Sequence, residues 1–206
     1  MTPEIALSFG NSLPLLVDSP QVPRFYVAKT IYIVLTICTG LLLFLVAYYW
    51  MVRKTRMLKD PSGIYSLGKS QMAFWGLIVF FTFIGIWVLT GRMEFIPTQV
   101  LILLGISGAT GLSAVIMENE KDQKNRNENP SALKKDSTGF WRDICSDSAG
   151  PAFYRLQVVA WTVVLGILFI RSVTKGLSMP EFSETLLLLM GISNLTYLGF
   201  KFPEKK

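Results

Sequence analysis

Five long apolar runs without a charged side chain constrain this chain more than any other feature. They cover residues 30–51, 72–90, 98–117, 156–170 and 185–200. A helix needs about 20 apolar residues to cross the ~30 Å hydrocarbon core of a bilayer. The first three runs meet that length, and the fourth does so if Arg171 extends its charged end to the interface. The fifth has about 17 residues with its flanks, which local thinning of the bilayer accommodates.

A soluble helical protein would need polar helical faces to shield such runs from water, and the runs show none. We therefore predict an all-α integral membrane protein with five transmembrane helices. The first helix, residues 30–51, stands alone after an extracytoplasmic N-terminal segment, residues 1–29. Two helical hairpins follow at residues 60–117 and 147–200, joined by a cytoplasmic loop at 118–146 and followed by a cytoplasmic tail at 201–206.

The placement of the basic residues predicts the orientation of these helices. The loops after the first and third runs, the start of the fourth run and the tail together hold 15 of the 20 Lys and Arg residues. Excess Lys and Arg mark the cytoplasmic side of a membrane protein. We therefore expect the N-terminus outside and the C-terminus inside, with the basic inner face against anionic lipid headgroups. Basic residues next to membrane spans have this ordinary explanation, so we expect no nucleic-acid partner.

Several function classes lack the residues that they need. The chain has no histidine, which removes the commonest proton shuttle and metal ligand. We find no pair of catalytic carboxylates and no glycine-rich phosphate loop, so we expect neither an enzyme nor a metal or other cofactor. The apolar runs contain no Asp or Glu of the kind that couples transport to protons or ions. The two cysteines, Cys38 and Cys145, indicate no disulfide framework.

The chain contains an internal repeat. When residues 69–112 are placed on 155–198, 12 of the 44 positions are identical, and the offset is 86 residues throughout. The matches include the pattern Gln-x-x-x-Trp and the pattern Gly-Ile-Ser-x-x-Thr, which chance matches among apolar residues do not readily give. We interpret this as a duplication of a two-helix hairpin. Both copies start on the same side, so they are parallel rather than inverted repeats.

The Gly-Ile-Ser-x-x-Thr pattern falls near the middle of the third and fifth runs. Its polar and small residues allow two interpretations: a seam where helices pack closely, or a hydroxyl and amide lining of a pore. We favour the seam, because small residues three or four positions apart drive most helix association in lipid. The residues concerned are Gly105, Ser107, Ala109, Thr110 and Ser113 in the first copy, and Gly191, Ser193, Asn194 and Thr196 in the second.

A second pattern marks the cytoplasmic entry of each hairpin: a basic residue, then Gln, then Trp four positions later. It consists of Lys69, Gln71 and Trp75 in the first copy, and of Arg155, Gln157 and Trp161 in the second. We favour an interfacial anchor, in which the cation meets headgroups and Trp lies in the aromatic belt. The alternative is a contact surface for a cytosolic protein partner.

With both patterns in one chain, residues 60–204 resemble a group of bacterial multi-pass membrane proteins of unassigned function. Members of that group carry two hairpins, each with an Arg-x-Gln entry, a Trp and a Gly-Ile-Ser-x-x-Thr midpoint. This sequence departs from the pattern at Lys69, where the first copy usually has Arg. The resemblance implies the hairpin fold and the bacterial inner membrane as the location. It implies no activity.

Two functions remain open at this point. The first is a non-enzymatic oligomeric scaffold, anchor or sensor for a cytosolic partner. The second is an oligomeric ion-permeable pore, of the kind that a membrane-disrupting defence or toxin effector would form. We favour the scaffold, because the residues that would line a pore are equally suited to helix packing. Both functions imply a homo-oligomer, since a chain of this size does not enclose a pathway alone.

Overall fold

The computed structural model describes residues 30–91, 95–128, 137–147 and 150–202, and these are mostly helical. The long helices are α1 (Thr30–Lys54), α2 (Leu67–Thr90), α3 (Thr98–Glu128), α5 (Phe153–Gly176) and α6 (Glu184–Lys201). Between α3 and α5 lie the short helix α4 (Phe140–Cys145) and two antiparallel strands, β1 (Ser146–Asp147) and β2 (Gly150–Pro151). The predicted N-terminal segment 1–29 lies outside the described residues.

Four of the helices, α1, α2, α3 and α5, are long and apolar enough to cross a membrane. This confirms the mostly helical fold with membrane-spanning character. The fifth predicted span corresponds to α6, which has 18 residues with Glu184 in its first turn and Lys201 in its last. It is not among the four, so the count of five spans stays a prediction.

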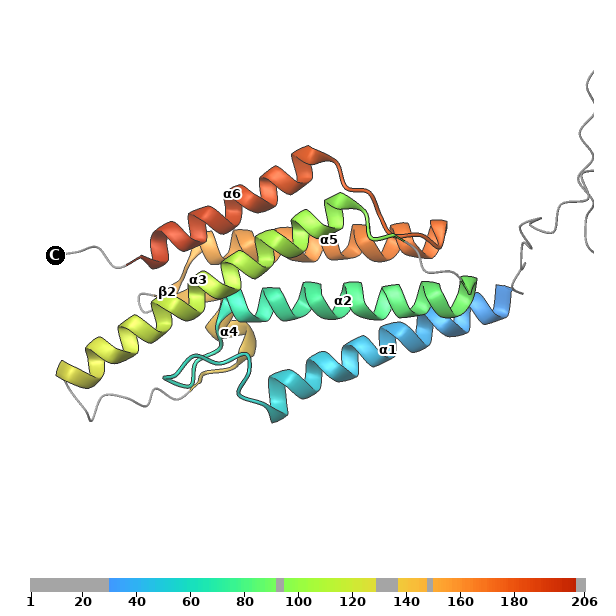
Figure 1. Cartoon of the computed structure of the whole chain (residues 1–206). Helices are drawn as coiled ribbons and strands as arrows, with labels where there is room; N and C mark the ends of the chain where they lie inside the picture. The colour runs from blue at the N-terminus through green and yellow to red at the C-terminus, as the bar shows by residue number, and fades with distance from the viewer. Residues whose placement is uncertain (1–29, 92–94, 129–136, 148–149, 203–206) are drawn as a thin grey trace, which may run out of the picture.

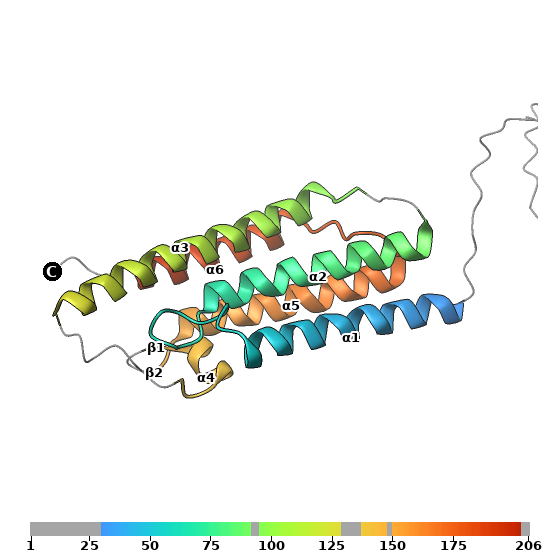
Figure 2. The ribbon, with the colours of Figure 1, turned by 60° about the horizontal axis from the view of Figure 1, so that its bottom comes forward.

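The helices form three layers (Figures 1 and 2). Helices α3 and α6 lie side by side in one layer, α2 and α5 form the next, and α1 covers α2 from outside. Helices α3 and α6 run in the same direction, as do α2 and α5. A Cβ added at Gly191 on α6 would lie 3.9 Å from the Ile106 side chain on α3. The two Gly-Ile-Ser-x-x-Thr patterns therefore contact each other across this layer, through Gly191 and Ile106.

The two hairpins pack differently at the end where α2 and α5 begin. In the first hairpin two glycines bring α2 and α3 together: a Cβ at Gly68 would lie 2.8 Å from the Ala114 Cβ, and one at Gly111 would lie 2.9 Å from the Met72 sulfur. The same positions in the second hairpin, 86 residues on, are Tyr154, Tyr197 and Phe200. The Tyr154 ring stacks on both of the others, with its centroid 6.5 Å from that of Tyr197 and 4.8 Å from that of Phe200. At these matched positions the two helices of the first hairpin approach each other closely through glycines, whereas aromatic rings fill the space between the helices of the second hairpin.

Helix α3 continues well past the predicted end of its apolar run at residue 117. Its last turns carry the sequence ENEKDQKNRNE, which belongs to the predicted cytoplasmic loop 118–146, and the structure gives it a helical conformation to Glu128. Glu, Lys, Gln and Arg are good helix formers, and Glu120 lies four positions before Lys124, a favourable helical spacing. Extending an existing helix also avoids the cost of nucleation. Helix α3 thus extends into the predicted cytoplasmic loop 118–146, and the location of that loop stays a prediction.

Candidate functional site

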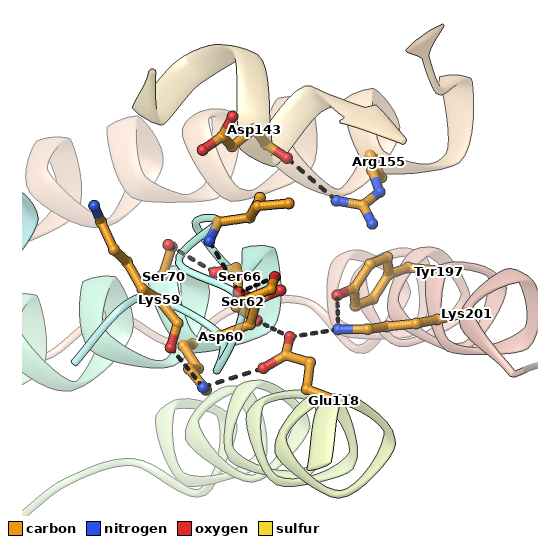
Figure 3. Close-up of polar contacts among 12 residues, drawn as sticks. Lys59, Asp60, Ser62, Ser66, Ser70, Glu118, Asp143, Arg155, Tyr197 and Lys201 are labelled. Carbon is orange, nitrogen blue, oxygen red and sulfur yellow. Dashed lines mark hydrogen bonds and ion pairs between the residues drawn. The ribbon is translucent and has the colours of Figure 1, made fainter. Parts of the chain in front are cut away.

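The candidate site is the polar end of the bundle, by which we mean residues 55–66, α4, β1–β2 and the helix ends that adjoin them. At this end α1, α3 and α6 finish, and α2 and α5 begin (Figure 1). Four segments that are distant in the sequence meet here in an ordered arrangement of polar contacts (Figure 3). No comparable set of ion pairs joins the opposite end within the part of the chain that the structure describes.

Glu118 on α3 is the centre of these contacts. Its side chain is 7% exposed and forms ion pairs with two lysines: Lys69 on α2, at 3.1 Å from Nζ to Oε2, and Lys201 on α6, at 2.6 Å from Nζ to Oε1. Ser66 donates its hydroxyl to the same Oε1 at 2.5 Å. A buried carboxylate must be paired and hydrogen-bonded to remain ionised. Glu118 therefore ties both ends of the first hairpin to the last turn of the second (Figure 3).

The segment between α1 and α2 is folded against this centre. Asp60 accepts hydrogen bonds from the Ser62 hydroxyl at 2.7 Å and from the Ile64 amide at 2.9 Å, which closes a turn. Gly63 has a φ of 99°, a left-handed conformation that favours glycine. Lys59 contributes its carbonyl oxygen to the Lys69 ammonium at 2.8 Å. The turn thus places Lys69 so that its charge faces Glu118.

Asp143 on α4 holds the segment before α4 to the start of α2. Its carboxylate accepts the Ser137 hydroxyl at 2.6 Å, the Thr138 hydroxyl at 2.9 Å and the Tyr65 amide at 3.3 Å. Burial opposes ionisation of this carboxyl, but the hydrogen bonds from Ser137, Thr138 and Tyr65 outweigh it and lower its pKa below the usual value. Asp143 is therefore charged at neutral pH. Its hydrogen bonds join the segment before α4 to the segment before α2, which are far apart in the sequence.

Arg155 and Lys201 surround the aromatic stack of the second hairpin. The Arg155 guanidinium donates to the Asp143 carbonyl oxygen at 3.3 Å and lies 5.7 Å from the Tyr197 ring centroid. Lys201 lies 5.6 Å from the same centroid and donates to the Tyr197 hydroxyl at 3.1 Å. Cations over an aromatic face are attracted by its negative quadrupole. Tyr197 thus links the Glu118 contacts to those of Asp143.

The Ser and Thr residues of the Gly-Ile-Ser-x-x-Thr patterns satisfy their own helices. Ser107, Thr110, Ser193 and Thr196 each donate to a backbone carbonyl three or four positions earlier, at 2.8–3.0 Å. The first three are 1% exposed, so they are packed inside the bundle. Hydroxyls in this arrangement add little polarity to a surface.

The row of small residues on α3 points elsewhere. Gly105 and Ala109 are exposed, Ser113 is half-buried, and a Cβ at Gly105 would meet nothing within 4 Å. This row is therefore not a seam between the two hairpins of one chain. The close approach of α2 and α3 depends instead on Gly68 and Gly111, which we did not single out because they lie on two different helices.

The basic-Gln-Trp entries also face inward more than we expected. Trp75 is fully buried and Gln71 is 3% exposed, while the side chains of Lys69 and Arg155 are 16% and 14% exposed. Trp75 belongs to the apolar core, with its ring 6.3 Å from that of Phe169. This placement does not fit an aromatic-belt anchor or a protein contact surface for the first copy.

The glutamines of these entries bind across helices. Gln71 donates to the Thr162 hydroxyl on α5 at 3.3 Å, and Gln157 donates to the Ser193 hydroxyl on α6 at 3.1 Å. Trp161 and Gln157 are half-buried. Asn194 is 2% exposed, and its amide has no hydrogen-bond partner among the described residues. Side-chain hydrogen bonds across helices contribute about 0.6–2 kcal/mol each in membranes.

Sequence reasoning missed the importance of Glu118 and Asp143, because both lie in the stretch assigned to the cytoplasmic loop 118–146. One signal could have found Glu118: it directly follows an apolar run, so the helix carries it to the same end as the basic residues. Within the described residues, no group of three His, Cys, Asp or Glu side chains could hold a metal ion.

Comparisons with known proteins do not extend this picture. No protein-family model matches the chain, and neither a curated protein nor a solved structure is similar to it.

Proposed function

We propose that the chain is an oligomeric, non-enzymatic scaffold or anchor in the bacterial inner membrane, whose polar end holds a cytosolic protein partner. The observation that carries this proposal is the construction of the polar end. The connection between α1 and α2, and the described part of the connection between α3 and α5, fold there around two buried carboxylates, Glu118 and Asp143, instead of joining the helices by simple turns. Ordered loops of this kind, held by a rigid support, are the usual position of binding surfaces.

Exposed apolar side chains on the same end supply the contact area. Met57, Trp141 and Phe153 are 65%, 67% and 80% exposed, and they belong to the segment before α2, to α4 and to the start of α5. Aromatic and Met side chains are enriched in the buried centres of protein interfaces. A partner surface therefore fits α4 and its surroundings better than the buried basic-Gln-Trp entries.

The pore is the weaker reading of this geometry. The Ser and Thr hydroxyls that would line a pore donate to backbone carbonyls of their own helices, and three of the four residues are buried inside one chain. The outward row of Gly105 and Ala109 supports contact with a second copy instead, since small residues let helices approach closely in lipid. A duplicated hairpin gives each chain two similar outer helices, α3 and α6, for such contacts.

Crosslinking in living cells tests the scaffold. A photoreactive amino acid placed at Trp141 or Met57 should give a covalent adduct with a cytosolic protein. The matched control is Val88 on α2, which is 67% exposed at the opposite end. Adducts of the same partner from Val88, or the lack of any protein adduct from Trp141 and Met57, would contradict the proposal.

Labelling of single cysteines tests the orientation independently. In a chain whose Cys38 and Cys145 are replaced, Glu181→Cys lies at the end opposite the Glu118 contacts and Glu120→Cys lies next to them. Both side chains are exposed. We expect a membrane-impermeant maleimide to label Glu181→Cys in intact spheroplasts and Glu120→Cys only after permeabilisation. The reverse pattern would place the polar end outside.

A further inference from the structure

A cleft runs between α1, α2 and α5 in the half of the bundle away from the polar end. Its lining is apolar apart from three threonines. Two of these, Thr36 and Thr174, donate their hydroxyls to carbonyl oxygens of their own helices, at 2.9 and 3.0 Å. Apart from the Thr82 hydroxyl, the cleft therefore offers no side-chain polar group to a hydrophilic ligand, which favours an apolar occupant.

Two glycines make the cleft open. A Cβ at Gly40 on α1 would meet nothing within 4 Å, and one at Gly85 on α2 would meet only the Thr36 methyl group, at 4.0 Å. The inner end is closed by Phe44 and Ile78, which are 7% and 4% exposed. Phe44 is fixed there by an edge-on contact with Phe74, at 5.6 Å between ring centroids.

The length of the cleft matches half of a bilayer. Its lining residues on α2 run from Ile78 to Leu89, a separation of 11 residues. At 1.5 Å per residue this is about 17 Å, and one leaflet contributes about 15 Å to the hydrocarbon core. An acyl chain that enters the cleft at the outer end of the helices therefore reaches Phe44 at the depth of the bilayer midplane, where lipid tails end.

One cation lies close to the outer part of the cleft. Arg171 on α5 is three positions before the lining residue Thr174, so the two are neighbours on the helix surface, and Arg171 is exposed. It forms no ion pair with an acid among the described residues. Arg and Lys near the ends of membrane helices bind the phosphate groups of lipids.

From these observations we propose that the cleft between α1, α2 and α5 binds one acyl chain of a glycerophospholipid, whose phosphate lies at Arg171. Helix α1 has its main helix contact with α2, and α1 and α5 line the cleft from two sides, so a bound acyl chain would bridge α1 to the second hairpin. The proposed site rests on the membrane-spanning character of the helices and not on the scaffold proposal.

Photolabelling in a bilayer tests this site. The full chain is placed in vesicles of phosphatidylethanolamine and phosphatidylglycerol that contain a phosphatidylglycerol with a diazirine on its acyl chain. After illumination the labelled peptides are mapped. We expect label to concentrate around Gly40 and Gly85, and to be displaced by excess unlabelled phosphatidylglycerol. Label spread evenly over the exposed helix faces would overturn the proposal.

Two variants fill the cleft from opposite walls: Gly40→Leu and Gly85→Leu. The matched control is Gly76→Leu, which adds the same side chain to an exposed face of α2 outside the cleft, where a Cβ also meets nothing within 4 Å. We expect either cleft variant to lower the specific label about tenfold, equivalent to ~1.4 kcal/mol of binding free energy. Unchanged label in both, or an equal loss in Gly76→Leu, would overturn the proposal.

Arg171→Gln separates the headgroup from the tail. We expect this variant to retain label in the cleft but to need several times more unlabelled phosphatidylglycerol for displacement, since the phosphate contact is weakened. Helical content by circular dichroism confirms that each variant is folded. Identical competition in Arg171→Gln and the unmodified chain would show that Arg171 does not bind the phosphate, and this part of the proposal would be wrong.

Discussion

Glu118→Gln removes the negative charge that faces two ammonium groups while keeping the shape of the side chain. The change converts two ion pairs, at 2.6 and 3.1 Å, into neutral contacts. Removing one partner of a fully buried pair costs about 3–5 kcal/mol. Here the lysine side chains are 16% exposed and can turn toward water, so we expect a smaller loss, about 2 kcal/mol of unfolding free energy, near the value of a hydrogen bond to a charged group.

The assay is reversible unfolding in mixed detergent micelles, followed by tryptophan fluorescence. Glu120→Gln is the matched control, because Glu120 is an exposed acid two residues along the same helix, and we expect it to change stability by less than about 0.5 kcal/mol. Lys201→Met should cost about 1 kcal/mol, and the double variant with Glu118→Gln should show a coupling of similar size. If Glu118→Gln behaves like Glu120→Gln, Glu118 does not hold the hairpins together.

Three further predictions concern the bundle and its polar end. Gly68→Ala should destabilise the fold by about 1–3 kcal/mol through overpacking between α2 and α3. Gly105→Ala should be neutral or stabilising by up to ~1 kcal/mol. Equal effects of the two variants on the free energy of unfolding would refute the close approach of α2 and α3. Gly105→Leu with Ala109→Leu should yield a folded monomer on native gels, and an intact oligomer would exclude this face as the seam. Because the pKa of Asp143 is lowered in the folded chain, its contribution to stability is present above the unfolded pKa of about 3.8 and lost as the pH falls further. The protection of α4 amides against hydrogen exchange, relative to the intrinsic rate at each pH, should therefore fall only below about pH 4, and a loss of protection on going from pH 7 to pH 5 would contradict this.

The helices were predictable because the apolar runs are long and uncharged. The structure places a helix on each of the five runs and extends the second, third and fourth into neighbouring polar residues, to Leu67–Thr90, Thr98–Glu128 and Phe153–Gly176. Those extensions follow from helix propensity, which an apolar count ignores. Leu67 to Gln71, for example, are helical although Lys69 interrupts the apolar pattern.

The direction in which polar residues face was much less predictable. The positions of Ser107 and Ala109 in one pattern suggested one common surface, yet Ser107 is buried and Ala109 is exposed. In lipid both faces of a helix are apolar, so hydrophobicity does not distinguish the inner face from the outer one. Contacts such as Gly68 with Ala114, or Glu118 with Lys201, join helices that are distant in the sequence, and no local pattern records them.

Ion flux from liposomes that contain the purified chain tests the central claim most directly, because it separates a scaffold from a pore. The closed packing of Ser107 and Ser193 predicts no flux above that of empty liposomes, both for the unmodified chain and for Gly105→Leu, the variant that disrupts the proposed contact between copies. Flux through the unmodified chain that disappears in Gly105→Leu would mean that copies assemble around a conducting path, and the scaffold proposal would be wrong.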